Sequence, residues 1–213
     1  MSSSPRFISV CDVLPHEARS YALMMLLFIA GTTARAGEIA TTVTDQRGAP
    51  VADAVVYAMP RSGKPPQRTQ PTSIAHKNQQ FVPYVTAVQA GTLINLPNLD
   101  PVKHHAYSIS PAKSFELPLY SGTPEKPLLF DKPGIVSIGC NIHDWMRAYV
   151  YVVETPFFAI TEADGRAQLR GLAAGAYDVE VWQPRLKGGP AANKQQVTVG
   201  GAPAKITFAL DLR

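Results

Sequence analysis

The sequence has little charge and only two cysteines, and each scarcity narrows the classes of protein it can belong to. Only 17% of its 213 residues are charged and 46% are hydrophobic, a balance that is not typical of disordered chains. The net charge of +4 comes without a run of Lys or Arg, and no aromatic residues alternate with basic ones as nucleic-acid recognition requires. We therefore expect a folded protein with a hydrophobic core and no nucleic-acid partner.

The first 36 residues have the pattern of a secretory leader. Arg6 and Arg19 precede the apolar run 21–31, which is too short to cross a bilayer as a permanent helix. The Ala-Arg-Ala stretch 34–36 follows, with small residues where a signal peptidase cleaves. We predict that residues 1–36 are a signal peptide, that the mature chain is periplasmic, and that no membrane contact remains after cleavage. An uncleaved leader kept as a membrane anchor is the alternative, and both imply export.

Cleavage of the leader makes Cys140 the only cysteine, because Cys11 is removed with it. A single cysteine cannot form an internal disulfide, and a free thiol is a liability in an oxidising compartment. We therefore expect the Cys140 thiol to be occupied.

Long helical periodicity is also missing after the first forty residues, while nineteen prolines and fifteen glycines separate short runs rich in Val and Thr. Such runs between turns indicate strands, and we predict an all-β fold built from β-sandwiches. Residues 61–80, polar and rich in proline, are predicted to be a linker or long loop. The runs with strand character are 37–59, interpreted as a hairpin with its turn at 46–50, and then 85–96, 106–110, 135–140, 147–153, 157–162, 167–172, 177–182, 196–199 and 204–210.

The two ends of the mature chain resemble parts of one small domain. The stretch 43–57, V-T-D-Q-R-G-A-P-V-A-D-A-V-V-Y, resembles the first hairpin of the carboxypeptidase regulatory-like, transthyretin-type domain, and 161–182 resembles the rest of it. The resemblance implies that this small β-sandwich is split by an inserted β domain, since domains tolerate insertion at exposed loops. The predicted boundaries are 37–76 for the first hairpin and linker, 77–154 for the inserted domain, and 155–213 for the remainder. Two successive modules are the alternative, with the first hairpin belonging to the middle one.

Three residues that suit a copper ion occur in one short motif, C-x2-H-x2-M, at Cys140, His143 and Met146. A type 1 copper site uses a thiolate, two imidazoles and a weak thioether, so three of its four ligands are present here. This spacing would also place the three residues on one face of a helix. Because the runs on both sides of the motif have strand character, we predict a tight loop that joins two strands.

The second imidazole is expected from His104 or His105, in N-L-D-P-V-K-H-H-A-Y-S-I-S at 98–110. Strand alternation favours His105, because His105, Tyr107 and Ile109 share the face that carries more apolar bulk.

The stretch 81–154 resembles the plastocyanin/azurin (cupredoxin) family. It has the A-G-T turn, an N-x-D before the first histidine, P-G-x5-C, and a ligand loop with amicyanin-like spacing. The resemblance implies a Greek-key β-sandwich with one mononuclear type 1 copper, held by His104, Cys140, His143 and Met146. Family members usually have Asn where His105 stands. His105 is thus either the alternative ligand or a neighbour whose imidazole N–H ties the ligand loops together.

The whole chain resembles the methylamine-utilisation type of cupredoxin-domain protein. This implies a periplasmic carrier of single electrons between redox proteins such as a dehydrogenase or a c-type cytochrome. It also implies that His143 lies nearest the surface. We expect Trp145 beside it either to form part of an apolar docking patch or to pack within the loop, and Asp144 to tune the protonation of His143.

Other functions have less support in the sequence. The four ligands leave no open position for substrate, the His-x-His pairs of a multicopper oxidase are missing, and no nucleophile elbow is present, so an enzyme is not expected. A copper-binding and delivery protein is the alternative, although the chain after residue 36 has few Met and His residues for storage.

Overall fold

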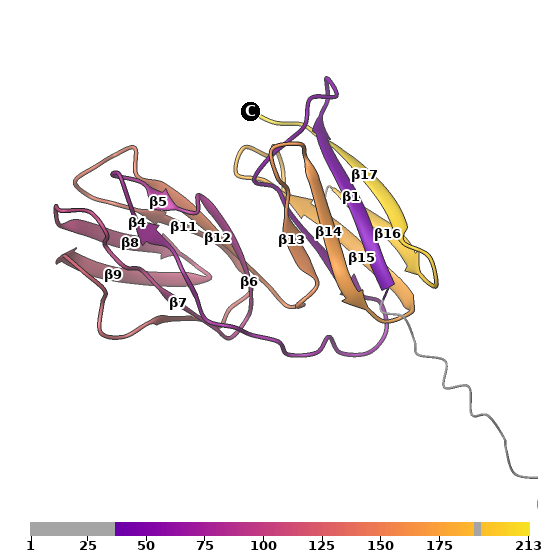
Figure 1. The fold of residues 1–213 in the computed structure, drawn as a ribbon, viewed down its shortest axis with the longest axis horizontal. Coiled ribbons are helices and arrows are strands. Elements are labelled where there is room, and N and C mark those ends of the chain that lie inside the picture. Colours follow the sequence, from indigo (N-terminus) through magenta and orange to yellow (C-terminus); the bar gives the residue numbers. More distant parts are fainter. Residues whose placement is uncertain (1–36, 190–192) are drawn as a thin grey trace, which may run out of the picture. The chain divides into compact units, whose positions relative to one another are not determined.

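The computed structural model describes residues 37–189 and 193–213. Within these residues the regular structure consists of seventeen β-strands and no helix (Figure 1). The all-β prediction is therefore confirmed. The same residues contain no helix long and apolar enough for a membrane span. The signal peptide predicted at 1–36 lies outside the described residues.

Strands from both ends of the described chain share two sheets, whose facing sides form one hydrophobic core. Buried and half-buried residues alternate from Gly37 to Thr44 in the first strand, as expected of a strand with one face in a core. One sheet has the order β14 (Arg166–Leu172), β1 (Gly37–Asp45), β17 (Ala204–Leu210), and the other has the order β13 (Phe158–Ile160), β2 (Val55–Pro60), β15 (Gly175–Trp182), β16 (Lys194–Val199). We call these seven strands the end sandwich.

The hairpin predicted over 37–59 is wrong as a strand pairing. The turn after β1 is tight, and the Asp45 carboxylate accepts two backbone N–H groups within it. However, β1 and β2 lie in different sheets. The chain folds back along β1 only at Pro50 and Val51, where Thr44 forms a β-bridge with Pro50 and the Val51 N–H donates to the Val43 carbonyl oxygen. Val51 and Ala54 are buried, and the chain then crosses to β2 in the second sheet.

The segment between Thr72 and Val153 forms three other sheets, and none of its described strands pairs with a strand of the end sandwich. We call it the middle segment. The domain boundaries at 76/77 and 154/155 stay predictions. The largest sheet has the order β6 (Val85–Gln89), β12 (Arg147–Val153), β11 (Gly134–Gly139), β8 (His104–Ser110), β9 (Lys113–Tyr120), a second has the order β10 (Leu128–Phe130), β7 (Thr92–Asn95), β3 (Thr72–Ser73), and the third pairs β4 (Ala75–His76) with β5 (Phe81–Val82).

The stretch 61–80, predicted to be a linker or loop, contains two short strands. Thr72 in β3 pairs with Ile94 in β7, and β4 pairs with β5. Ile74 and His76 are fully buried. Strands of two residues are too short to produce an alternating pattern, so they could not be recognised in this polar, proline-rich sequence.

Candidate metal centre

The C-x2-H-x2-M motif forms the loop between β11 and β12. These two strands pair in antiparallel register from Gly134 opposite Val152 to Gly139 opposite Arg147. The Met146 N–H donates to the His143 carbonyl oxygen at 3.0 Å and closes the loop. The predicted strand–loop–strand arrangement is confirmed, and the paired strands fix where the loop begins and ends.

Three of the predicted ligand residues lie together at this loop. One ligand atom from each of His104, Cys140 and His143 lies within 4.8 Å of the other two. The Cys140 Sγ is 3.8 Å from the His143 Nδ1, and the two imidazole rings have centroids 5.0 Å apart. His104 is 0% exposed and Cys140 4%, whereas His143 is half-buried. His143 is therefore the more exposed of the two histidines.

The His104 ring has one nitrogen engaged and one free. Its Nε2 lies 2.8 Å from the Asp100 Oδ2. Because a carboxylate accepts, Nε2 carries the proton and the Nδ1 lone pair is left. That Nδ1 is buried and has no hydrogen-bond partner among the described residues, which costs free energy unless something occupies it.

His105 points to a different neighbour. Its Nε2 lies 3.0 Å from a Glu116 carboxylate oxygen, and its ring packs on Tyr107 with centroids 5.5 Å apart. Within the described residues its imidazole N–H therefore bonds to β9 and not to the Cys140 loop. His105 is absent from the group of converging ligand atoms.

The alternation argument for His105 fails because β8 is irregular. The pairing of β8 with β9 shifts register between His104 and Ala106, and the three residues 104–106 are all buried. A bulge of this kind breaks the alternation of sides along a strand. Ile109, predicted to be on the apolar side, is 86% exposed.

Met146 lies in the same core cluster as Cys140. It is 2% exposed, and the two sulfur-bearing residues also line one cavity with Tyr107 and Arg147. A buried thioether therefore belongs to the same core cluster as the thiol.

The donor set fits a copper ion. A buried thiol, a buried ring nitrogen without a partner and a second imidazole converge, with a thioether in the same loop. Soft sulfur with imidazole nitrogen is the combination that copper takes in type 1 sites.

Solved structures similar to this chain include cupredoxins and a copper enzyme. One is a purple cupredoxin from Nitrosopumilus maritimus, with 21% identity and a TM-score of 0.34 over 38% of this chain and 99% of that one. Another is a reduced amicyanin variant, with 16% identity and a TM-score of 0.35 over 38% of this chain and 80% of that one. A copper-containing nitrite reductase from Thermus scotoductus is similar over 54% of this chain and 28% of its own length, with 23% identity and a TM-score of 0.38. No family model and no curated protein matches the chain. These identities and TM-scores leave its family open.

The Asp100 carboxylate is held by more than His104. It also accepts the backbone N–H groups of Asn78 (2.6 Å) and Gln79 (2.8 Å), whose φ angles of 55° and 56° are unusual for residues other than glycine. Burial raises the pKa of Asp100, but the two N–H groups and the His104 ring outweigh this and hold the pKa below its usual 3.8. Asp100 is thus a charged anchor for the His104 ring.

The segment of Asn78 and Gln79 also contacts Trp145, which packs on the second histidine, His143. The indole Nε1 donates to the Gln79 carbonyl oxygen at 3.2 Å, and the indole ring packs on His143 with centroids 5.1 Å apart. Trp145 is 66% exposed. Asp144 is also exposed and, within the described residues, has no hydrogen bond or ion pair with His143, so no contact supports the expected tuning.

His76 is a neighbour of the candidate ligands that no sequence motif indicated. It is fully buried, its ring packs on His104 with centroids 5.2 Å apart, and its Nε2 lies 3.1 Å from the Tyr120 hydroxyl. Burial, and then the neighbouring His104, lower the pKa of His76 to about 4, so its ring is neutral at pH 7. A single histidine in a polar stretch carries no signal of this role.

Proposed function

We propose that this chain is a type 1 copper protein that carries single electrons between redox partners. The observation that carries the proposal is the convergence of one ligand atom from each of His104, Cys140 and His143 within 4.8 Å. These three residues would hold the ion, and Met146 would add a weak thioether. When bound, copper supplies a one-electron couple between Cu(II) and Cu(I).

The surroundings of the donors favour electron transfer over catalysis or delivery. The hydrogen bond that the His104 Nε2 donates to the Asp100 carboxylate orients His104, and the β11–β12 pairing holds the loop that bears Cys140. Donors fixed in this way change little in position between two oxidation states. Since His104 and Cys140 are almost fully buried, substrate access and metal release are both hindered.

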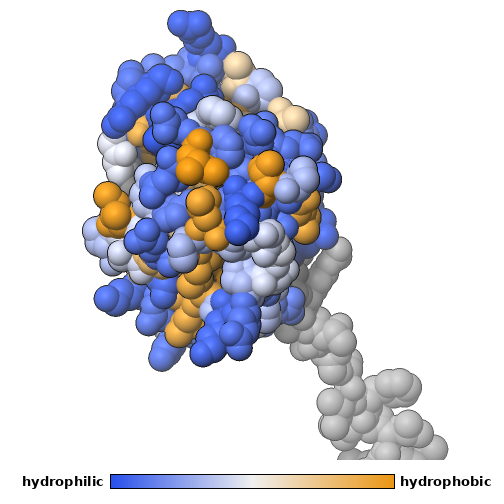
Figure 2. Space-filling model, turned by 90° about the vertical axis from the view of Figure 1, so that its left-hand side faces the viewer, coloured by the Kyte–Doolittle hydropathy of each residue, from blue (hydrophilic) through white to orange (hydrophobic). Residues whose placement is uncertain are grey.

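The electron would leave through His143, the more exposed histidine, and the partner would dock on apolar residues around it. The two segments that carry the ligands and their neighbours expose large apolar side chains, namely Leu99 (64%), Val102 (44%), Ile142 (50%) and Trp145 (66%). Figure 2 shows, on the face viewed there, apolar residues interrupted by hydrophilic ones. A small mixed surface of this kind suits a transient partner such as a dehydrogenase or a c-type cytochrome.

The proposal includes a location and a domain organisation. Residues 1–36 would direct export to the periplasm, and 77–154 would be the copper domain. A carboxypeptidase regulatory-like domain would be built from 155–213 and from the part of 37–76 that precedes the linker, since β3 and β4 at 72–76 pair with strands of the middle segment. Support for the split domain comes from the two sheets that strands of both chain ends share.

The test is the absorption spectrum of the purified protein loaded with Cu(II). We expect an intense thiolate-to-copper band near the red end of the visible range. Cys140→Ser, which is nearly isosteric, should remove the band and weaken copper binding. A colourless parent, together with a Cys140→Ser variant that binds copper equally well, would overturn the proposal.

A second measurement separates an electron carrier from a delivery protein. The copper-loaded, reduced protein is mixed with an apo-acceptor and then separated from it. A carrier of electrons keeps its copper in this mixture and is reoxidised when a one-electron acceptor is added afterwards. Transfer of copper to the apo-acceptor would favour delivery.

A further inference from the structure

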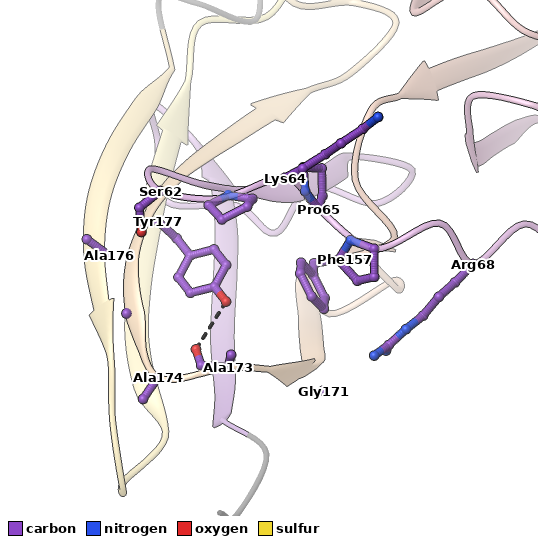
Figure 3. A pocket seen from close by; sticks show the side chains of 13 residues that line it. Ser62, Lys64, Pro65, Arg68, Phe157, Gly171, Ala173, Ala174, Ala176 and Tyr177 are labelled. Carbon is purple, nitrogen blue, oxygen red and sulfur yellow. Dashed lines mark hydrogen bonds between the residues drawn. The ribbon is translucent and has the colours of Figure 1, made fainter.

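The end sandwich contains a pocket that the proposed copper site does not use. It has a volume of about 240 Å³, and none of its lining residues is a candidate ligand. The rings of Phe157 and Tyr177 form its aromatic wall, with centroids 6.0 Å apart at an interplanar angle of 86°. Figure 3 shows both rings between the segment that bears Lys64 and Pro65 and the turn that bears Ala173 and Ala174.

The pocket exists because the turn between β14 and β15 has almost no side chains to fill it. The turn and the strand ends beside it read G-L-A-A-G-A at 171–176, and their one large residue, Leu172, is fully buried in the core. Gly171 and Gly175 have φ angles of 76° and 155°, which glycine tolerates best. Small residues are therefore favoured at these places, and the space beside the two rings stays open.

The aromatic wall of the pocket has no polar group that needs a hydrogen bond from a ligand. The Tyr177 hydroxyl already donates to the Ala173 carbonyl oxygen at 3.0 Å, so its polar atom has a partner inside the protein. Phe157 is 5% exposed and Tyr177 4%, so a third aromatic group would contact only the parts of this edge-to-face pair that line the pocket.

The polar groups at the pocket are cationic. Lys64 and Arg68 belong to its lining, which includes no Asp or Glu. The Arg68 guanidinium lies 5.9 Å from the Phe157 ring centroid. In the part of the chain that the structure describes, neither cation has a carboxylate partner within 4.0 Å. Figure 3 shows the Lys64 and Arg68 side chains extending to different sides of the pocket, so Arg68, beside Phe157, is the cation that an anion at the aromatic wall would meet.

We propose that this pocket binds a small aromatic carboxylate with a single ring. The ring lies against Phe157 and Tyr177, and the carboxylate meets Arg68, whose guanidinium donates two N–H groups to the two carboxylate oxygens in a matched geometry. The volume admits one ring and excludes ligands of nucleotide or drug size, whose pockets are larger.

The test is a titration of the isotopically labelled protein with benzoate, followed by amide chemical shifts. We expect saturable shifts at 171–177 and Phe157. Benzyl alcohol has the same ring without the charge, and acetate has the charge without the ring, so both should bind at least about fivefold more weakly. Shifts confined to the loop 140–146 would place the benzoate at the candidate metal centre and overturn the proposal.

A charge-matched pair of variants tests the role of the cations. Lys64→Gln with Arg68→Gln should weaken benzoate binding by about fivefold, since exposed ion pairs are screened by solvent. Lys126→Gln with Lys132→Gln removes the same charge from two exposed lysines outside the pocket and should leave the affinity unchanged. Equal affinities in both double variants would contradict the proposal, and neither result depends on whether the chain binds copper.

Discussion

His104 and His105 are adjacent in β8 but have different partners, and this difference makes a prediction at the residue scale. In both histidines Nε2 lies beside a carboxylate and the buried Nδ1 has no hydrogen-bond partner among the described residues. They differ because the His104 ring converges with Cys140 and His143, whereas His105 does not belong to that group. We expect His104→Ala to abolish the visible band of the Cu(II)-loaded protein and His105→Ala to preserve it, as recorded by absorption spectroscopy. Loss of the band in His105→Ala alone would reverse the assignment.

Asp100 is predicted to strengthen copper binding although it does not touch the metal. Asp100→Asn keeps the shape of the side chain but removes the charge that fixes the protonated Nε2 of His104. Changes to groups that orient a histidine ligand typically weaken metal binding by about tenfold or more. We expect a loss of about that size, measured by competition with a copper chelator. Asp131→Asn, at an exposed position, is the matched control, and equal affinities in the two variants would count against the role of Asp100.

Two turn glycines give a prediction at the scale of elements. Gly165 has a φ of 73°, and a Cβ there would lie 2.4 Å from the Val43 carbonyl oxygen, whereas a Cβ at Gly48 (φ 84°) would meet nothing within 4 Å. Both substitutions by Ala carry the cost of a left-handed backbone, and Gly165→Ala adds a backbone overlap. We expect Gly165→Ala to lower the free energy of unfolding by about 3 kcal/mol and Gly48→Ala by about 1 kcal/mol. Urea denaturation measures both free energies of unfolding. Similar losses in the two variants would show that the turn at Gly165 can shift to relieve the overlap.

Individual strands of this fold were predictable where one face alternates, but their partners were not. The range predicted for β12, 147–153, is the one observed, and β14 was predicted to within a residue. The pairing of β1 with β17 joins residues from opposite ends of the chain. A local pattern records which face is buried but carries no information about which distant strand covers it.

The candidate site was predictable for a related reason and within the same limit. Cys140, His143 and Met146 fall in one seven-residue loop, so their spacing alone brings them near one another. His104 was ambiguous because the bulge that turns it inward is visible only in the register with β9. The bonds of the Asn78–Gln79 turn to Asp100 and Trp145 link segments that are remote in sequence, and no spacing rule reveals them.

At the scale of the whole molecule, the end sandwich and the middle segment share part of a core. Val85 of β6 and Val153 of β12 belong to the same buried cluster as the end sandwich. Trp182 of β15 packs on Tyr151 of β12 with ring centroids 5.5 Å apart. Because β12 begins directly after Met146, the strand that ends the ligand loop also contacts the end sandwich.

This shared core predicts that metal bound at the loop stabilises the end sandwich. In Trp145→Phe, Trp182 is the only tryptophan, so its fluorescence reports unfolding of the end sandwich. Zn(II) takes thiolate and imidazole ligands, and at about a hundredfold excess over its dissociation constant it should stabilise the folded protein by about 2.7 kcal/mol. The Trp182 melting temperature should then rise by about 5–10 °C. The same variant with His104→Ala should lose most of this rise in melting temperature. If the Trp182 melting temperature does not change when metal binds, the two parts unfold independently.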